Sequence, residues 1–179
     1  MSFAMLRSLH ASPFAGERWD GVIWYSPSIF HGPLVKRLKR ESACKGYLII
    51  RDIFPEWAFD MGIMRRGFAY YFFKTVARYQ YSMANIIGVQ TAGNLKYFER
   101  WQKKSGHKLE VLPNWLGKPG DKLCKIRIKD TLLSGRRIIV YAGNMGIAQN
   151  LDVVLAAADK LRNRQDLGFL FVGRGSERE

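Results

Sequence analysis

The chain has few acidic residues and few cysteines for its length. Its 179 residues include 15 Asp and Glu against 29 Lys and Arg, which gives a formal net charge of +14 at pH 7. Cys44 and Cys124 make no disulfide framework and lack metal-ligand spacing, so the cysteine usage indicates a reducing compartment. No run of about 18 apolar residues occurs, which excludes a membrane-spanning helix. Residues 1–19 lack a continuous apolar stretch, and we do not expect a signal peptide there.

Several motifs with a known chemistry are also missing from the sequence. It contains no Walker phosphate loop, no CxxC, no HExxH and no recognisable context for a Ser/His/Asp triad. It also lacks GxGxxG followed about 20 residues later by an acidic residue, which argues against a nicotinamide or flavin enzyme. His10 and His107 have no partners at metal-ligand spacing, so we assign them no role.

The excess of basic over acidic residues is the most informative feature of the composition. A pI near 10 favours a polyanionic partner, which could be nucleic acid, an anionic membrane surface or a phosphorylated substrate. The charge does not choose between these partners. A basic α/β domain that binds nucleic acid, with Trp and Tyr stacked on bases, is therefore one open interpretation.

Short apolar runs alternate with amphipathic helical patterns along the chain. This alternation predicts an α/β fold with a doubly wound, Rossmann-like parallel sheet, whose strands are buried on both faces. Helices are expected from Gly32-Pro33 onward, from about Gly67 onward, over Ala92–Lys104, and along the stripe from Leu151 to Leu161. The expected strands are Gly21–Tyr25, Tyr47–Ile50, Ile86–Val89, Leu109–Leu112, Ile138–Ala142 and Leu167–Val172.

The alternation of strand and helix patterns is interrupted at one place in the sequence. This interruption predicts where the first domain ends and the second begins. Residues 117–135, with Gly, Pro and several Lys, are typical of a linker between a first domain at 1–116 and the start of a second at 136–179. The last strand–helix–strand unit cannot bury both faces of its sheet alone. We therefore expect the chain to be a piece of a longer protein.

Polar residues follow the strands of the first domain, where parallel sheets bind ligands. Arg51 and Asp52 come after one strand, and Glu56 follows shortly after them. Arg51 could hold a phosphate, and Asp52 or Glu56 could bind hydroxyls or act as a base. The alternative is an ion pair between Arg51 and Asp52 beside a structural corner at Pro55 and Trp57. His31 follows the first strand and could donate a hydrogen bond to a substrate or simply lie exposed. Asn114 ends the fourth strand, where its amide suits a polyol ligand.

Two glycine-containing loops follow the strands of the second domain. Gly143, Asn144 and Gly146 precede a helix, whose N-terminus favours an anion such as a diphosphate. Gly173 and Gly175 are expected beside them on the same sheet edge. The alternative is that these glycines serve only the sterics of tight turns.

The helix that follows Arg65-Arg66 is rich in aromatic residues. One stripe of this helix is expected to face the core, and it consists of Phe68, Phe72, Val76, Tyr79 and Met83. A second stripe, of Arg66, Tyr70, Lys74, Arg78 and Tyr81, is expected to face outward, either as a solvated surface or in a lipid headgroup layer.

Six segments in order resemble the retaining glycosyltransferases of family four (group 1), which have the GT-B fold of two facing Rossmann-like domains. The segments that contain RDIFPEWA and PNW are similar in sequence to enzymes of O-antigen and capsule assembly, including fucosaminyltransferase-like members. The segments are DGVIWYSPSIFHGPLVKRLKR, LIIRDIFPEWAFDMGIM, ANIIGVQTAGNLKYF, LEVLPNWL, VYAGNMGIAQNLDVVLAAADKL and FLFVGRGSERE.

The resemblance implies a nucleotide-sugar donor, a lipid-linked or polysaccharide acceptor, retention of anomeric configuration and no catalytic metal or separate cofactor. It places the chain at the cytoplasmic face of the inner membrane, in contact with anionic lipid, and implies no nucleic-acid partner. It puts donor-binding roles on the second-domain loops and catalytic roles near the acceptor. The donor-binding residues would be Gly143, Asn144, Gly146, Gly173, Gly175 and Asn114, and the catalytic candidates His31, Arg51 and Asp52.

The sequence departs from the family pattern in three places. The family's glycine-rich loop near the first strand of its N-terminal domain has no counterpart. The later segment with two glutamates separated by seven residues, which holds the donor, is absent, and so are the basic residues further along that usually neutralise the diphosphate. We therefore expect an internal fragment of an enzyme about twice this length, inactive on its own.

Overall fold

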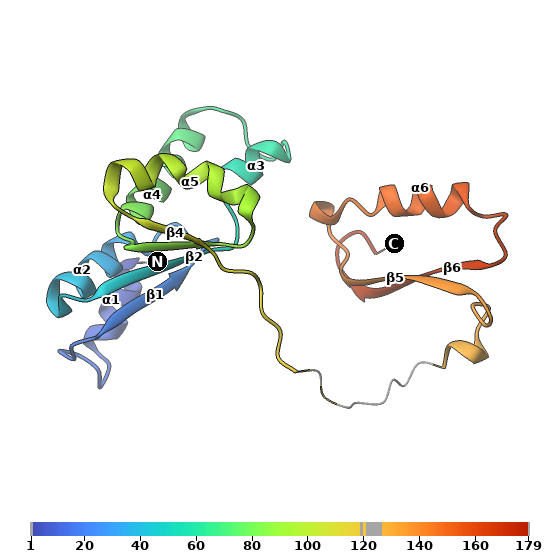
Figure 1. The fold of residues 1–179 in the computed structure, drawn as a ribbon, viewed down its shortest axis with the longest axis horizontal. Coiled ribbons are helices and arrows are strands. Elements are labelled where there is room, and N and C mark those ends of the chain that lie inside the picture. Colours follow the sequence, from blue (N-terminus) through green and yellow to red (C-terminus); the bar gives the residue numbers. More distant parts are fainter. Residues whose placement is uncertain (1, 119, 121–126, 179) are drawn as a thin grey trace. The chain divides into compact units, whose positions relative to one another are not determined.

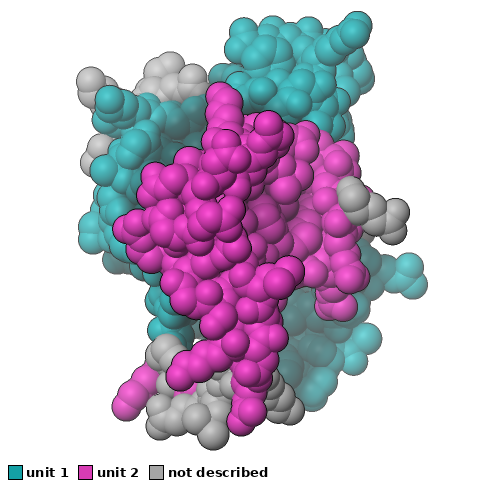
Figure 2. All heavy atoms as spheres, turned by 90° about the vertical axis from the view of Figure 1, so that its right-hand side faces the viewer, with its two compact units in different colours: residues 1–117 teal, residues 118–179 magenta. Residues whose placement is uncertain are grey.

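The structure is a computed structural model, and it describes residues 2–118, 120 and 127–178. The chain divides into two compact units, residues 1–117 and residues 118–179, coloured separately in Figure 2. Each unit holds its own sheet and is described by itself. Parts of the expected linker, together with Cys124, lie outside the described residues, namely 119 and 121–126.

Unit 1 alternates helices and strands as the sequence predicts. Its elements are α1 (Ser2–His10), β1 (Gly21–Tyr25), α2 (Gly32–Ser42), β2 (Lys45–Ile50), α3 (Glu56–Asp60), α4 (Phe68–Ser82), β3 (Ile86–Val89), α5 (Ala92–Ser105) and β4 (Lys108–Val111), shown in Figure 1.

The four strands of unit 1 form one parallel sheet in the order β1-β2-β3-β4. The register pairs Trp24 with Leu48 and Leu48 with Ile87, so these three apolar residues form a row across the sheet. Each of the first three strands is followed by a helical segment that returns the chain to the next strand, which is the geometry that parallel pairing requires. The predicted α/β class with Rossmann-like parallel sheets is confirmed.

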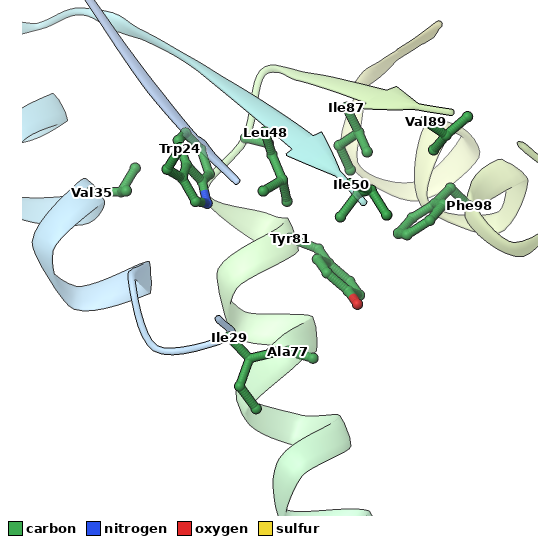
Figure 3. Packing of buried hydrophobic residues seen from close by; sticks show 11 residues of the cluster. Trp24, Ile29, Val35, Leu48, Ile50, Ala77, Tyr81, Ile87, Val89 and Phe98 are labelled. Atoms are coloured by element: carbon green, nitrogen blue, oxygen red, sulfur yellow. The ribbon is translucent and has the colours of Figure 1, made fainter. Parts of the chain in front are cut away.

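The core of unit 1 lies between the sheet and its helices. Leu48, Ile50 and Ile87 are fully buried, and their side chains point toward Tyr81 and Ala77 of α4 (Figure 3). Tyr81 in turn meets Phe98 of α5 edge-to-face, with ring centroids 5.2 Å apart. Burying several large apolar side chains, at about 1.5–3 kcal/mol each, is the main stabilisation of this unit.

The expectation that both faces of this sheet are buried is wrong for the described residues. Burial alternates along β1 and β2, with Trp24 and Leu48 buried while Ile23 and Tyr25 are 73% and 61% exposed. A strand–helix–strand unit repeated in one direction places its helices on one side. The apolar runs predicted the strands correctly, but not the covering of their second face.

The second face of the sheet carries a hydrogen bond that crosses a strand. The hydroxyl of Tyr47 on β2 donates to Oε1 of Glu110 on β4 at 2.6 Å, above Gly88 of β3. A Cβ at Gly88 would overlap the Tyr47 hydroxyl, so only glycine allows this crossing. Burial, together with the hydrogen bond to Glu110, raises the pKa of Tyr47 to about 12.

The raised pKa predicts an alkaline loss of stability that Tyr47→Phe removes. A group with a higher pKa in the folded state contributes stability that is complete below its unfolded value of about 10 and is lost as the pH rises toward 12. Between pH 9 and pH 11.5 we expect wild-type unit 1 to lose about 1 kcal/mol more unfolding free energy than Tyr47→Phe.

Urea unfolding at each pH, followed by tryptophan fluorescence, measures this difference. Tyr25→Phe is the matched control, because Tyr25 lies on the same sheet face but is 61% exposed. Equal alkaline losses in wild type, Tyr25→Phe and Tyr47→Phe would contradict the prediction.

Helix α4 packs with only part of the face that was predicted, because Val76 and Met83 of the expected stripe lie against the core while its other members do not. Phe68 is 89% exposed, whereas Tyr70 and Tyr81, which were expected to face outward, are buried. Ala77 lies between these two tyrosines on the buried stripe, and its small side chain lets the helix approach the sheet. Both stripes are aromatic, so helical periodicity alone could not choose between them.

Unit 2 is a smaller strand–helix–strand unit. Its two strands pair in parallel from Arg137 and Leu167 to Asn144 and Arg174. Its described elements are the 3-10 helix η1 (Ile128–Asp130), β5 (Arg137–Asn144), the 3-10 helix η2 (Ile147–Gln149), α6 (Asp152–Lys160) and β6 (Leu167–Arg174).

Candidate functional site

The carboxyl edge of the unit 1 sheet is organised by Ser26, which directly follows β1. Its buried Oγ accepts the backbone N–H of Arg51 at 2.7 Å and of Asp52 at 3.0 Å. These two hydrogen bonds hold the turn after β2 against the end of β1. The sequence marked Ser26 only as the end of a strand, and its role in placing Arg51 and Asp52 was not predicted.

A pocket of about 370 Å³ opens beside this turn, between β2, α3 and α5. It combines cationic, anionic, amide and aromatic groups, the mixture that typically orients a polar ligand. We call it the unit 1 pocket. Its lining residues are Arg51, Asp52, Ile53, Glu56, Trp57, Asp60, Asn94 and Tyr97.

Glu56 is the most constrained polar group of the unit 1 pocket. Its Oε1 accepts the Tyr97 hydroxyl at 2.6 Å and forms an ion pair with Lys74 Nζ at 2.9 Å. Lys74 also donates to the Tyr70 hydroxyl at 3.0 Å. Burial by itself lowers the pKa of Lys74, but the hydrogen bonds with Glu56 and Tyr70 outweigh it and raise the pKa above its ordinary value.

The second oxygen of Glu56 has no hydrogen-bond partner among the described residues, although it is buried. An unsatisfied buried carboxylate oxygen is costly, and a donor from a bound molecule would satisfy it. A ligand hydroxyl could therefore donate to this oxygen while Lys74 stays paired with the other oxygen of the same carboxylate.

The structure brings together only some of the predicted residues of unit 1. Arg51 and Asp52 line the unit 1 pocket with exposed side chains, whereas His31 and Asn114 do not line it. Their roles in catalysis and binding stay predictions. Asn114 instead accepts a hydrogen bond from Gln90 Nε2 at 3.0 Å, at the ends of β3 and β4.

His31 stands at the start of α2, anchored through its backbone. Its N–H donates to Gln80 Oε1 at 2.9 Å, and Gln80 Nε2 donates to the carbonyl of Ser28 at 2.9 Å. The imidazole Nδ1 is buried with no hydrogen-bond partner among the described residues, and burial lowers the pKa of His31. The neutral imidazole is therefore favoured at this position.

Three residues that line the unit 1 pocket were not singled out from the sequence: Asp60, Asn94 and Tyr97. Lys74, which pairs with Glu56 without lining the pocket, was predicted only as part of an outward-facing stripe. Tyr97 and Lys74 reach Glu56 from helices far along the chain, so no local spacing could reveal them. One signal was available for Lys74, which is the single charged residue between Arg66 and Arg78 on a largely aromatic helix.

The glycine segments of unit 2 belong partly to strands, which corrects the predicted loops. Gly143 and Asn144 end β5, and Gly173 and Arg174 end β6. The two strands pair Gly143 with Gly173 and Asn144 with Arg174. The ladder continues because glycine and asparagine do not interrupt backbone pairing here, so the turns begin later, at Met145 and Gly175.

Gln149 organises the turn after β5. Its Oε1 accepts both the Asn144 side-chain amide and the Gly146 N–H, each at 3.1 Å. The Tyr141 hydroxyl donates to the Asn144 carbonyl at 2.5 Å. Asn144 and Gly146 are thus engaged within the turn, and a ligand there would have to replace Gln149.

The predicted helix N-terminus is not directly behind the glycine turn. The 3-10 helix η2 intervenes, and α6 begins only at Asp152. A carboxylate in the first turn of a helix already interacts with the positive end of the helix dipole. An anion at this edge would therefore depend on backbone N–H groups of the turn more than on α6.

Steric contacts explain why two positions of unit 2 are occupied by glycine. A Cβ at Gly173 would overlap the carbonyl oxygen of Gly143, and one at Gly175 would overlap the carbonyl oxygen of Met145. A Cβ at Gly146 would meet only the ends of the Asn144 and Gln149 side chains, at 2.9 and 3.2 Å. Packing of backbone on backbone is thus sufficient to require glycine at 173 and 175, and it leaves the donor-binding roles of these residues as predictions.

Within 2–118, 120 and 127–178, no group of three or more His, Cys, Asp or Glu side chains is arranged to hold a metal ion. In the same described residues, no helix has the length and apolar content needed to cross a membrane.

Comparison with known proteins supports a relationship to glycosyltransferases. No protein-family model matches the sequence. Over 185 aligned positions, however, the chain is 26% identical to an Escherichia coli K12 protein provisionally named colanic acid biosynthesis glycosyl transferase WcaI. The chain is similar to a glycosyltransferase. The match covers 90% of this chain and 42% of the E. coli protein, so the chain spans less than half the length of that relative.

Proposed function

We propose that the chain is part of a retaining glycosyltransferase of family four with the GT-B fold. It would transfer a sugar from a nucleotide-sugar donor to a lipid-linked or polysaccharide acceptor during assembly of a cell-surface glycan. The observation that carries this proposal is the similarity along 90% of the chain to a protein named for colanic acid biosynthesis. Polar groups at the carboxyl edges of both sheets support it.

The two units would have different roles. In unit 2, the Arg174 guanidinium would face the donor diphosphate, and the Gly146 N–H would donate to it once the ligand had replaced Gln149 Oε1. The Met145 N–H is already used, because it donates to the Arg174 carbonyl at 2.9 Å. In unit 1, Asp52 and the unpaired oxygen of Glu56 would accept hydrogen bonds from acceptor hydroxyls. Sugar transfer leaves negative charge on the departing diphosphate, and stabilising that charge is the main electrostatic task of the site.

Titration of the isotope-labelled chain with UDP, GDP and their sugars, followed by NMR, tests the donor role. We expect amide shifts confined to unit 2, centred on Gly146, with a dissociation constant in the millimolar range, because the paired-glutamate segment is missing from the sequence. Asn144→Asp keeps the side-chain shape but adds a negative charge, and should abolish these shifts. Asp166→Asn, remote from the turn in sequence, is the charge control.

A second candidate function is nucleic-acid binding, which the net charge of +14 favours. Binding of that kind weakens steeply as salt rises, because phosphate contacts release counterions. If nucleotides and their sugars leave unit 2 unperturbed, while single-stranded RNA or DNA binds with a steep salt dependence, the glycosyltransferase proposal is overturned and the second function is favoured.

A further inference from the structure

The unit 1 pocket concentrates carboxylates in a basic part of the chain. Unit 1 contains eight Asp and Glu against 17 Lys and Arg, and three of the eight acids line this one pocket. They are Asp52, Glu56 and Asp60. Lys74, paired with Glu56, and Arg51 offset two of the three negative charges. The pocket is therefore opposite in sign to the rest of unit 1.

The carboxylates of the pocket include hydrogen-bond acceptors that the protein does not use. Among the residues that the structure describes, Asp52 and Asp60 form no ion pair with a Lys or Arg. A carboxylate accepts hydrogen bonds and donates none, so it needs a hydroxyl, an amine or a metal ion as its partner. No three acids within the described ranges are arranged to hold a metal ion. These acceptors therefore favour a ligand that brings hydroxyl or amino hydrogens.

Trp57 gives the pocket a flat apolar wall. Its side chain is 38% exposed, and its ring lies against that of Phe54 with centroids 6.0 Å apart. Asp60 follows Trp57 by three residues along α3, on the same side of the helix, so an acceptor borders the ring. One face of a sugar ring presents C–H groups and its rim carries hydroxyls. That distribution matches an aromatic wall edged by acceptors.

Two positive features of the pocket do not reverse its preference. Arg51 carries a full charge, and Asn94 lies in the first turn of α5 (Ala92–Ser105), whose N-terminus is equivalent to about half a charge. Opposing them are the two full negative charges of Asp52 and Asp60, since Lys74 already offsets Glu56. A carboxylate or phosphate on the ligand would meet net repulsion.

We propose that the unit 1 pocket takes an uncharged sugar ring and disfavours acidic sugars. The ring packs flat on Trp57, and its hydroxyls donate to Asp52 and Asp60. The choice of a sugar as ligand rests on the proposed function, whereas the preference for an uncharged ring rests on the charges of the pocket itself. The pocket thus selects the terminal sugar of the acceptor glycan.

NMR titration of the isotope-labelled full chain tests the preference. The probes are the methyl glycosides of glucose and galactose and those of the corresponding uronic acids, which share the ring and add a carboxylate. We expect the Trp57 indole N–H and the Asn94 side-chain amide to shift with the neutral glycosides at pH 7. The dissociation constants of the uronic acids should be about three- to fivefold larger.

Tryptophan variants test the apolar wall. Trp57→Ala should abolish the shifts of the Asn94 amide with every glycoside, because the ring loses the surface on which it packs. Trp115→Ala is the matched control, since Trp115 is 67% exposed and does not line the pocket. It should leave all the titrations unchanged. Hydrogen exchange of the β2 and β3 amides verifies that each variant is folded.

Asp52→Asn combined with Asp60→Asn tests the electrostatic origin of the preference. The amides keep the size of the side chains and remove both negative charges, which leaves Arg51 to attract a carboxylate. The double variant should bind the uronic acids at least as tightly as the neutral glycosides. Asp20→Asn removes an exposed acid of unit 1 outside the pocket and should keep the preference of wild type.

Three results would overturn this proposal. They are no shift at Trp57 or Asn94 with any neutral glycoside, equal or tighter binding of the uronic acids by wild type, and an unchanged preference in the double variant. None of these solutions contains a nucleotide. Neutral glycosides that bind in the pocket while nucleotide sugars leave unit 2 unperturbed would support the sugar site and contradict the proposed transferase.

Discussion

Replacing Gly173 with alanine is expected to unfold the β5–β6 sheet of unit 2. The added Cβ would overlap the carbonyl oxygen of Gly143 on the paired strand, and a backbone atom cannot move aside as a flexible side chain can. The strands must separate at this end or the ladder must shift. Overpacking against backbone costs about 3 kcal/mol or more, which is a large share of the stability of so small a unit.

Gly143→Ala is the matched control on the paired strand. Its Cβ would meet only the Tyr141 hydroxyl, at 3.3 Å, and that side chain can move by a few tenths of an ångström. Hydrogen exchange of the β5 and β6 amides should accelerate strongly in Gly173→Ala and little in Gly143→Ala. All five tryptophans lie in unit 1, so their fluorescence reports whether that unit is unaffected. Equal protection in the two variants would show that the glycine is not needed for packing.

This comparison separates two explanations that the sequence left open. A glycine can allow close packing of backbone, or it can let a ligand approach the backbone. The first explanation accounts for Gly173 and Gly175, where the overlap is with backbone atoms. It does not account for Gly143 or Gly146. The donor-binding hypothesis therefore depends mainly on the turn after β5.

The strands were predictable because a buried parallel strand is a short apolar run. The predicted ranges Gly21–Tyr25 and Ile86–Val89 have these same bounds in the structure. The strand predicted over Ile138–Ala142 extends to Asn144, because the pairing with β6 continues through residues that the sequence presents as a turn. Pairing depends on a distant partner strand, which a local pattern does not contain.

The candidate site was predictable only where its residues follow strands. Arg51 and Asp52 could be found because the ends of parallel strands meet at one sheet edge. Tyr97 and Lys74 could not be found, since they reach Glu56 from positions on α5 and α4 that only the packing of those helices determines. The sequence analysis placed Lys74 on the outward-facing stripe of α4. That prediction would have put Lys74 away from Glu56.

Lys74→Met is expected to destabilise unit 1 by about 2–4 kcal/mol. Only about a fifth of the Lys74 and Glu56 side chains is exposed, so little water can replace the lost ion pair. Glu56 would then carry a negative charge with one oxygen already lacking a partner among the described residues. Removing one member of a largely buried pair leaves the other member uncompensated, which costs more than the pair contributes.

Combining Lys74→Met with Glu56→Gln should restore most of the lost stability. The glutamine amide oxygen can still accept the Tyr97 hydroxyl, while no charge remains to be compensated. Urea unfolding followed by tryptophan fluorescence measures both variants and gives their coupling energy in a double-mutant cycle. Arg37→Met is the comparison for an exposed pair, Arg37–Glu41 at 2.7 Å, and should cost less than about 0.5 kcal/mol.

The cycle also separates a structural from a binding role for Glu56. If Glu56 serves only to neutralise Lys74, the double variant should regain stability and bind an acceptor glycan as wild type does. If its unpaired oxygen accepts a ligand hydroxyl, the double variant should regain stability but bind more weakly, because an amide is a poorer acceptor than a carboxylate. A Lys74→Met variant as stable as wild type would mean that the ion pair is not the feature that positions Glu56 in the unit 1 pocket.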